Sequence, residues 1–532
     1  MGGPCEFRSS EEVREGFIDG TNFGRRRVKY SLIDGEAIFE GDIVLRPLTD
    51  NAGAPQMIDD PSRGLIISGK RYRWPSGVVP FVIDSGLPDT ARVTDAIQHW
   101  HDNTPIIFVA RKDDANYVRF RSGDGCSSPV GMAGGEQKLT LDTGCTKGNA
   151  IHEIGHAVGL WHEQSREDRN QHVTIHEDNI EDGREHNFNQ HISDGDDIGP
   201  YDYGSIMHYS AAAFSANGSP TIETPNGEAI GQRNGLSSGD IAAVNYMYYP
   251  VTPMSVGSGV FSIRQQSNAR FLDAHEYSAK DFAIVTRPSQ SNDTQRWIVR
   301  PVGAVYTLRQ RSNGRLVDAH EYSGADFRVV TRDNQNNDTQ RWVIMFLGDG
   351  EYTVRQVSSG RFLDAHASAS KDHSMVTRPG SSSDAQRWLI RASDAGSFTL
   401  QQKSTGRFAD AHEIAEKDFM LVTRPEQNNA TQQWLLAPIE TICTIQQLSN
   451  RRYVDAYRSQ DHDFALVTRG AKNNDDQKWL FRARGSNLFT IQQWSSRRYM
   501  DAHEIEGRDF AVVTRPAQNN ATQNWMVDRV PR

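Results

Sequence analysis

The second half of the chain is built from six copies of one pattern, and this repeat restricts the fold more than any other feature. The copies are centred on RFLDAH (270–275), RLVDAH (315–320), RFLDAH (361–366), RFADAH (407–412), RYVDAY (452–457) and RYMDAH (498–503). Their aspartates follow one another at intervals of 45 or 46 residues: Asp273, Asp318, Asp364, Asp410, Asp455 and Asp501. Such a constant interval indicates that each copy is one structural unit packed against its neighbours.

Each copy divides into four short runs typical of β-strands. In the first copy these runs are FSIRQQ, RFLDAH, FAIVTR and QRWIVR, and turns rich in Asn and Asp separate them. Helical periodicity is absent, so we expect an all-β region beyond residue 254. Four strands in each copy suit either a six-bladed β-propeller or two β-trefoils of three lobes each.

The end of each copy favours the trefoils. A glutamine and a tryptophan stand two residues apart in all six: Gln295 and Trp297, Gln340 and Trp342, Gln386 and Trp388, Gln432 and Trp434, Gln477 and Trp479, Gln523 and Trp525. This QxW ending resembles that of the ricin B-chain family of trefoil lectins. The resemblance implies tandem trefoils, 254–392 with copies one to three and 393–532 with copies four to six, and tryptophans in their cores. The propeller is the alternative.

The ricin resemblance also implies candidate sugar sites. In that family an aspartate binds sugar hydroxyls, an aromatic ring stacks on the sugar, and an asparagine precedes the QxW glutamine. The six repeated aspartates match the first requirement, but Arg287 stands at the aromatic position and Thr294 at the asparagine position of the first copy. The repeated aspartates therefore either bind sugar or another polar ligand in some lobes, or form structural salt bridges with the repeated arginines. Tyr457 replaces the repeated histidine in the fifth copy.

A second pattern, HExxHxxGxxH, lies in the first half of the chain. His152 and His156 are four apart, so on a helix they lie on the same face and can reach one ion, with Glu153 beside them. Gly159 can take a positive φ that ends the helix and turns His162 toward the same ion. Three imidazoles leave a fourth position for water, as in catalytic zinc sites. Histidines that serve only the core are the alternative.

Five further segments accompany this pattern. They are RYRWPSGVVPFVID (71–84), GCSSPVG (125–131), HEQSREDR (162–169), SIMHY (205–209) and LSSGDIAAVNYMYYP (236–250). Together with the histidines they resemble the astacin subgroup of the metzincin metalloproteases, over about residues 65–250. This resemblance implies an α+β catalytic domain of two subdomains.

The astacin resemblance assigns roles to individual residues. It implies that His152, His156 and His162 bind one zinc ion and that Glu153 holds the water as general base. It further implies that Met207 forms the apolar floor under the metal and that Tyr209 hydrogen-bonds the oxyanion. The strand-like run QKLTLD (137–142) is either an edge strand on which an extended substrate pairs or merely the last strand of the sheet.

The segment FEGDI (39–43) matches the FxGDI pattern of astacin propeptides, in which the aspartate binds zinc and keeps the enzyme latent. We therefore expect residues 1–64 to be a propeptide, with Asp42 as a zinc ligand of the latent form only. A Gly-Asp pair is also common in ordinary turns. Cleavage near SRGL (62–65) would release an N-terminus that meets Glu163, as the resemblance implies.

The four cysteines indicate the compartment. Cys126 and Cys145 lack the spacing of a structural zinc site, and we expect them to form a disulfide, which favours an oxidising environment. We expect Cys5 and Cys443 to be free thiols. The first twenty residues lack the apolar region of a signal peptide, so secretion would need an upstream start, a trimmed chain or an unconventional route.

Composition bounds the remaining choices. A chain of 532 residues should hold about three or four domains. The net charge of −10 gives no basic footprint for nucleic acid, and a membrane span is excluded because no apolar run reaches the required length. Two functions follow: a latent secreted zinc endopeptidase for protein substrates, anchored to glycans by its trefoils, or a lectin-like protein with an inactive protease fold. The sequence predicts no oligomeric state.

Overall fold

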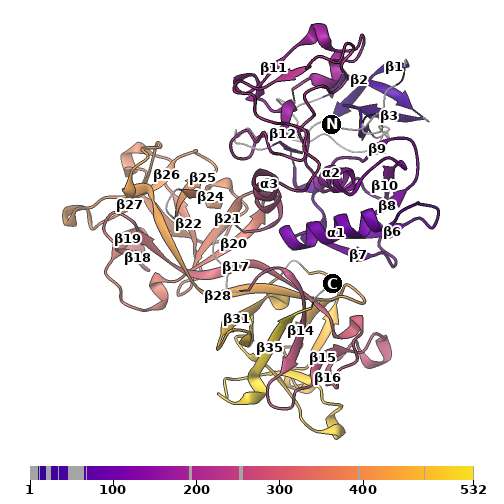
Figure 1. Ribbon diagram of the computed structural model, residues 1–532. Helices are drawn as coiled ribbons and strands as arrows, with labels where there is room; N and C mark the ends of the chain where they lie inside the picture. Colours follow the sequence, from indigo (N-terminus) through magenta and orange to yellow (C-terminus); the bar gives the residue numbers. More distant parts are fainter. Residues whose placement is uncertain are drawn as a thin grey trace. The chain divides into compact units, whose positions relative to one another are not determined.

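The computed structural model describes residues 7, 10, 12–19, 25–33, 35–45, 65–67, 69–190, 195–250, 256–393, 396–472 and 474–530. They form two compact units, Met1–Tyr248 and Tyr249–Arg532 (Figure 1). Cys5 and residues 62–64, where a free thiol and a cleavage point were predicted, lie outside the described residues. None of the helices in the described part of the chain has the length and apolar character that a bilayer crossing requires.

The first unit begins with a small antiparallel sheet upstream of the predicted protease domain. Its strands follow the chain in order: β1 (Val13–Asp19), β2 (Arg25–Ile33), β3 (Glu36–Phe39) and β4 (Ile43–Leu45). Phe39 pairs with Ile43, so residues 40–42 form the tip of the hairpin between β3 and β4. The FEGDI segment is thus a turn, as its Gly-Asp pair allows, but a turn whose tip is fully buried.

The catalytic part of this unit contains a five-stranded sheet of order β7-β6-β8-β10-β9. Its strands are β6 (Val78–Ile83), β7 (Ile107–Ala110), β8 (Tyr117–Arg121), β9 (Cys126–Ser127) and β10 (Glu136–Leu141). Two short sheets pair β5 (Ile66–Ile67) with β12 (Gly195–Asp196) and β11 (Thr174–Ile175) with β13 (Ile222–Glu223). The helices are α1 (Ala91–Asn103), α2 (Lys147–Val158) and α3 (Ser238–Tyr248). All three helices share one apolar core with the large sheet.

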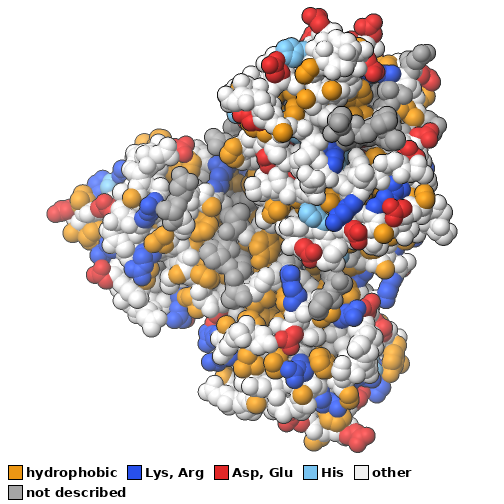
Figure 2. Space-filling view, viewed as in Figure 1, with side chains coloured by type: hydrophobic (Ala, Val, Ile, Leu, Met, Phe, Trp, Pro, Cys, Tyr) orange, Lys and Arg blue, Asp and Glu red, His pale blue; other side chains and the backbone are white. Residues whose placement is uncertain are grey.

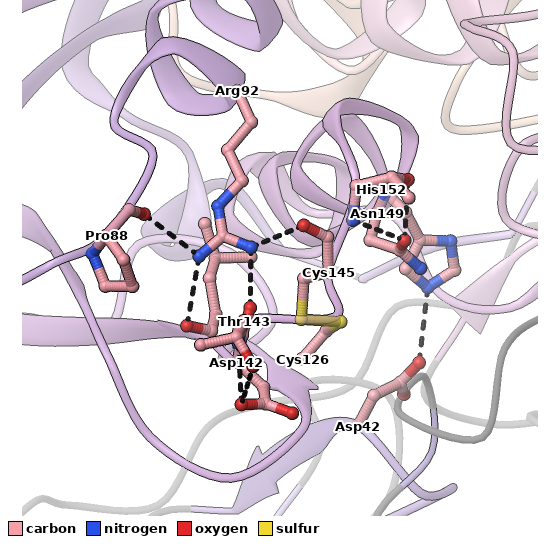
Figure 3. Close-up of a disulfide and its surroundings, with 11 residues drawn as sticks. Asp42, Pro88, Arg92, Cys126, Asp142, Thr143, Cys145, Asn149 and His152 are labelled. Carbon is pink, nitrogen blue, oxygen red and sulfur yellow. Dashed lines mark hydrogen bonds and ion pairs between the residues drawn. A yellow bond between two sulfur atoms is a disulfide. The ribbon is translucent and has the colours of Figure 1, made fainter.

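Helix α1 is held to this core by an apolar stripe and by one buried cation. Val93, Ala96, Ile97 and Trp100 are buried at the spacing of one helix face. Arg92 donates hydrogen bonds to the carbonyl oxygens of Asp142 and Cys145, at the end of the sheet (Figure 3). The predicted disulfide is present: it joins Cys126 of β9 to Cys145, directly before α2.

The second unit is all β, as expected. Its strands are β14 (Gly259–Gln265), β15 (Phe271–Ala274), β16 (Ile284–Arg287), β17 (Trp297–Gln310), β18 (Leu316–Ala319), β19 (Val329–Arg332), β20 (Trp342–Gly348), β21 (Glu351–Gln356), β22 (Phe362–Ala365), β23 (Met375–Arg378), β24 (Trp388–Ser393), β25 (Ser397–Gln402), β26 (Phe408–Ala411), β27 (Leu421–Arg424), β28 (Trp434–Gln447), β29 (Tyr453–Ala456), β30 (Leu466–Arg469), β31 (Trp479–Ala483), β32 (Leu488–Gln493), β33 (Tyr499–Ala502), β34 (Val512–Arg515) and β35 (Asn524–Arg529). All six QxW tryptophans are buried in its cores.

The repeats close into two rings of three, which excludes the propeller, but the grouping differs from the expected division at 392/393. One hydrophobic core is built by repeats two, three and four, and the other by repeats one, five and six. Figure 1 shows β18 to β27 in one body and β14 to β16 with β31 to β35 in another. The trefoil of repeats two, three and four is therefore inserted into the trefoil of repeats one, five and six, between repeats one and five.

The insertion results from an exchange of strand partners at two repeat junctions. At the other three junctions the QxW tryptophan pairs with a glutamine in its own hairpin, as Trp342 does with Gln356. Trp297 instead pairs with Gln447, and Trp434 pairs with Gln310. β17 and β28 are accordingly continuous strands of 14 residues that run antiparallel to each other.

Both exchanged junctions are short and contain a proline. Gln310 follows Trp297 by 13 positions and Gln447 follows Trp434 by 13, whereas the corresponding glutamine follows its tryptophan by 14 at the other three junctions. Pro301 and Pro438 lie within the shortened segments. A shorter hinge favours an exchange of strands over a closed hairpin, and proline stiffens it further. The sequence thus offers a local reason for the exchange.

Candidate metal centre

Helix α2 carries the first two histidines, and its ends explain their placement. Thr146 caps the N-terminus through reciprocal hydrogen bonds with Asn149. Gly159 ends the helix with φ 119°, the left-handed conformation predicted for it. The chain then turns back, so that the His162 ring lies 4.7 Å from the His156 ring and 5.4 Å from the His152 ring, centroid to centroid.

The hairpin tip of the upstream sheet enters this cluster. Asp42 Oδ2 lies 3.2 Å from Nε2 of both His152 and His162, and Asp42 Oδ1 lies 3.7 Å from His156 Nε2 (Figure 3 shows the contact with His152). All four side chains are buried. One ligand atom from each lies within 4.8 Å of the others. The predicted site residues therefore meet, although Asp42 is 110 positions from His152.

The donor set fits one zinc ion. His156 Nε2 and Asp42 Oδ1 are buried yet have no hydrogen-bond partner among the described residues, which is unusual for buried polar atoms. The Nδ1 atoms of all three histidines face oxygen acceptors at 2.8 Å: the Ile206 carbonyl, the Leu160 carbonyl and the Glu40 carboxylate. Each Nδ1 must therefore donate, which leaves each Nε2 with its lone pair directed to a common point. Three imidazole nitrogens and one carboxylate oxygen are a ligand set typical of zinc.

The pKa values of the cluster are governed by burial and by the two carboxylates. Burial is the largest influence on Asp42 and would raise its pKa, but the three imidazoles hold that pKa well below its usual value. Burial also opposes the charged form of His162, yet Asp42 and Glu40 raise its pKa to about 9. Burial lowers the pKa of His152 to about 3. Of these two histidines, only His162 has its charged form favoured by the buried carboxylates, whereas burial keeps His152 neutral.

Met207 packs against helix α2, and its role as the apolar floor under the metal stays a prediction. Its sulfur is 2.6 Å from the place that a Cβ atom would take on Gly155 of α2. Asp240 of α3 fixes the turn that contains Met207, because its carboxylate accepts hydrogen bonds from the Ser205 hydroxyl at 2.7 Å and the Ile206 amide at 3.0 Å. No pattern in the sequence pointed to this role of Asp240.

Tyr209 and Glu153 border the cluster. The Tyr209 ring centroid lies 4.7 Å from that of His162, and its hydroxyl donates to the backbone carbonyl oxygen of Glu40 at 2.6 Å. Glu153 follows His152 in α2 and is buried. The role of Tyr209 in oxyanion stabilisation stays a prediction.

Glu163 is buried and has partners of its own. Its Oε1 accepts a hydrogen bond from the Asp202 amide at 2.8 Å and lies 3.3 Å from Arg166 Nη1. Burial is the main cause that raises the pKa of Glu163 to about 8. Its pairing with a new N-terminus stays a prediction.

The strand β10 that was expected to bind substrate pairs with β9 only at Thr140 and Leu141. It is therefore not quite the last strand of the sheet, because the two-residue β9 follows it. Glu136 to Leu139 pair with β8 on the other side. The role of this edge in substrate binding stays a prediction.

The repeated aspartates are buried parts of the trefoil structure. In all six repeats the aspartate Oδ1 accepts a hydrogen bond from the next backbone amide at 2.7–2.8 Å. In repeats one, three, four and six the QxW glutamine donates to Oδ2 at 3.2–3.3 Å. The repeated arginine of those same repeats lies 3.6–4.0 Å from the aspartate. A pocket of about 550 Å³ in repeat three is lined by Asp364, Arg378 and Gln386.

Sequence reasoning missed Glu40. Its carboxylate lies 2.8 Å from His162 Nδ1 and accepts a hydrogen bond from the Ser165 hydroxyl at 3.0 Å. Glu40 stands at the variable position of FxGDI, so the motif itself assigns it no role. A second acidic residue two positions from Asp42, across a glycine, is the signal that could have pointed to it.

Comparison with known proteins agrees with the resemblances described for both halves of the chain. Residues 66–249 match the astacin family of peptidases, and residues 249–331 and 338–419 match the family of ricin-type beta-trefoil lectin domain-like proteins. Zinc metalloproteinase nas-15 of Caenorhabditis elegans is 40% identical over 230 residues, which are 40% of this chain and 39% of that protein. Human meprin A subunit beta is 39% identical over 40% of this chain and 30% of its own length. The chain thus spans about two fifths or less of these curated relatives.

Among solved structures, high choriolytic enzyme 1 of Oryzias latipes, a hatching enzyme zinc-protease, is 38% identical. The match covers 32% of this chain and 90% of that one, with a TM-score of 0.30. The designed three-fold symmetric protein ThreeFoil is 26% identical over 25% of this chain and 97% of its own, with a TM-score of 0.23. The family matches and the histidine cluster together lead to one conclusion: residues 66–249 of this chain belong to the astacin family of zinc metalloproteases, and ricin-type β-trefoil lectin domains follow them.

Proposed function

We propose that this chain is a latent, secreted zinc endopeptidase that hydrolyses protein substrates and is anchored by its trefoils. The observation that carries the proposal is the buried cluster of His152, His156, His162 and Asp42. With zinc bound to the histidines, the Asp42 carboxylate would take the position that water needs and would block hydrolysis without disturbing the three histidines.

The chain's own residues divide the chemistry among them. Zinc, when bound by the three histidines, supplies a Lewis acid that acidifies water and polarises the peptide carbonyl. Glu153 accepts the proton of the attacking water as general base and returns it to the leaving amine nitrogen. Tyr209 donates its hydroxyl hydrogen to the oxyanion of the substrate. Its present hydrogen bond to the Glu40 carbonyl supports this role, because a backbone carbonyl is the group that a peptide substrate would offer there.

Residues 1–64 act as the removable prosegment in this proposal. Asp42 is a zinc ligand of the latent form, and cleavage near SRGL (62–65) withdraws it. The new N-terminus would then pair with Glu163, a buried carboxyl group whose charged form a neighbouring ammonium would stabilise. Extended substrate would pair with the open edge of β10. The disulfide between Cys126 and Cys145 supports an extracellular location.

The trefoils bind a glycan or another polar ligand in this proposal. The pocket of repeat three offers both donors and acceptors, because Arg361 and Arg378 lie with Asp326 and Asp364 around it. On the face drawn in Figure 2, acidic and basic side chains are interspersed. This balance suits a neutral polyhydroxyl ligand better than a strongly charged one.

The test compares zinc content and casein hydrolysis of three samples: the full chain, a form that begins near Leu65, and the full chain with Asp42→Ala. We expect about one zinc in each and hydrolysis only in the last two. Glu153→Gln in the shortened form should retain zinc and lose hydrolysis. A full chain as active as the shortened form would remove the latency proposal. Zinc-free and inactive samples throughout would favour a lectin-like protein with an inactive protease fold.

A further inference from the structure

The tip of the β3–β4 hairpin brings two carboxylates to the metal centre. Glu40 and Asp42 flank Gly41, and both Glu40 and Gly41 have positive φ values, 47° and 78°. This tight turn allows side chains two positions apart to reach the same cluster. Both carboxylates are fully buried. A buried carboxylate is costly unless it is paired and hydrogen-bonded, so each must have a specific partner.

The partners of the two carboxylates differ. Asp42 meets the Nε2 side of the histidines, where the ion binds. Glu40 meets the opposite side of one ring: its Oε2 lies 2.8 Å from His162 Nδ1. Its Oε1 accepts the hydroxyl hydrogen of Ser165, which ends the short helix that follows His162. The backbone oxygen of Glu40 accepts the Tyr209 hydroxyl, so the residue is fixed at three points.

His162 is the only one of the three histidines whose outer partner is not part of the protease domain. The Nδ1 atoms of His152 and His156 donate to the carbonyls of Ile206 and Leu160, which remain after processing. The acceptor for His162 is Glu40, which lies upstream of the predicted cleavage point and would leave with the prosegment. Removal of residues 1–64 therefore changes the outer hydrogen bond of one ligand only.

We propose that Glu40 is a positioning residue through which the prosegment strengthens metal binding by His162, so that the latent chain holds zinc more tightly than the processed enzyme. The inference rests on the proposed function in one respect, that residues 1–64 are a removable prosegment. A carboxylate that accepts the outer N–H of a histidine fixes the ring and makes the opposite nitrogen a stronger donor. Loss of such a partner typically weakens metal binding about 10-fold to 100-fold.

The test measures zinc affinity by competition with a chelator, on chains that carry Glu153→Gln so that no sample digests itself. We compare the full chain, the full chain with Glu40→Gln and the form that begins near Leu65. The full chain with Glu40→Gln should bind zinc about 10-fold to 100-fold more weakly than the full chain, and the shortened form, which also lacks Asp42, should bind it more weakly still. Glutamine has nearly the shape of glutamate, so a role in packing alone predicts no change.

Glu36→Gln is the matched control. Glu36 lies on β3 of the same hairpin and accepts from Arg121 at 2.7 Å, away from the histidines. Its replacement should leave zinc affinity unchanged. Ser165→Ala removes one hydrogen bond of the Glu40 carboxylate and should give a smaller loss than Glu40→Gln.

Folding of the variant can be checked directly. Glu40 lies upstream of Leu65, so processing of the Glu40→Gln chain yields a product with the sequence of the processed parent. Recovery of the parent's zinc affinity in that product shows that the domain was folded. Equal zinc affinity in the parent and Glu40→Gln full chains would overturn the inference. Failure of latency appears separately, as hydrolysis by the full chain without Glu153→Gln, and leaves the comparison of affinities intact.

Discussion

His275 of the first repeat lies 2.9 Å from Asp509 of the sixth, although 234 positions separate them in the chain. The same contact recurs between other repeats, and it connects only repeats of one ring. Repeats two, three and four are joined by His320 with Asp418, His366 with Asp326, and His412 with Asp372. Repeats one, five and six are joined by His275 with Asp509, Tyr457 with Asp281, and His503 with Asp463. These contacts agree with the two cores.

The insertion of one trefoil into the other predicts which part of the chain can be removed. Deletion of residues 303–441, with a short turn joined in their place, should leave a cooperatively folded trefoil of repeats one, five and six. A chain that ends at residue 392 should not fold beyond residue 254, because it splits both rings. Thermal unfolding followed by near-ultraviolet circular dichroism checks both. Cooperative unfolding of β-structure in the second chain would contradict the grouping.

The grouping marks the limit of what the sequence predicted in this half. The strands, the all-β class and the buried tryptophans follow from local patterns in each repeat. Which repeats share a core does not, because six similar repeats can close in more than one set of three. The choice depends on one missing residue and a proline at two junctions, near Pro301 and Pro438, a signal visible only once the hairpins are compared.

The sequence predicted more of the metal centre than of the repeat grouping, because the histidine motif fixes side chains on one helix. Spacing placed His152 and His156 correctly, and Gly159 ended the helix as expected. Two residues that support the site were not predictable, because they reach it from distant elements. Glu40 contacts the His162 ring, and Asp240 holds the turn at Ser205 and Ile206. Tertiary contacts of this kind leave no periodic pattern in the sequence.

Gly148 is predicted to be essential for the turn that contains Met207. A Cβ atom on Gly148 would lie 1.8 Å from the Arg233 carbonyl oxygen, and backbone cannot move aside cheaply. Arg233 in turn donates to the carbonyls of Ile206 and His208, which flank Met207. Gly148→Ala should therefore lower the free energy of unfolding by about 1–3 kcal/mol or more and reduce zinc content.

The control for this prediction is Gly86→Ala. A Cβ atom at Gly86 would meet no atom within 4 Å, so the stability should change by less than about 0.5 kcal/mol. Denaturant unfolding and metal analysis of both variants check the expectation. Equal stability of the two variants would show that Arg233 can shift without cost.

The contact between Asp326 and His366 predicts a loss of trefoil stability in acid. Burial opposes the charged form, but hydrogen bonds from His366 and Lys371 hold the pKa of Asp326 below its ordinary value. The pKa of an aspartate in the unfolded chain is about 3.9. Because the pKa of Asp326 is lower in the folded state, its charge stabilises the fold at pH values above about 3.9, and this stabilisation is lost as the pH falls through the pKa of the folded state. Asp326 is about half exposed, so the contribution is at most about 1 kcal/mol.

Asp326→Asn should therefore destabilise the trefoils at pH 7, while variant and parent should converge as the pH falls below about 3.9. Asp333→Asn is the control, because Asp333 is 91% exposed and should leave stability unchanged at either pH. Urea unfolding over this pH range measures the difference. If the free energies of unfolding of the Asp326 variant and the parent differ as much in acid as at pH 7, the effect comes from packing and not from charge.

Cys443 provides a chemical probe for the unfolding of the ring of repeats one, five and six. It occupies the position that Tyr306, Tyr352 and Phe398 take after other junctions, and it is buried in the core of that ring. Burial raises the pKa of its thiol well above the usual value, and the thiolate is the reactive form.

Native chain with Cys5→Ser should therefore resist alkylation at neutral pH and react at the rate at which this trefoil unfolds. Mass spectrometry of chain treated with iodoacetamide, with and without urea, measures this rate. Because Cys443 lies on β28, the strand that carries the exchange, rapid alkylation of native chain would mean that the exchanged ribbon opens readily, whereas protection equal to global stability would mean that both rings unfold as one unit.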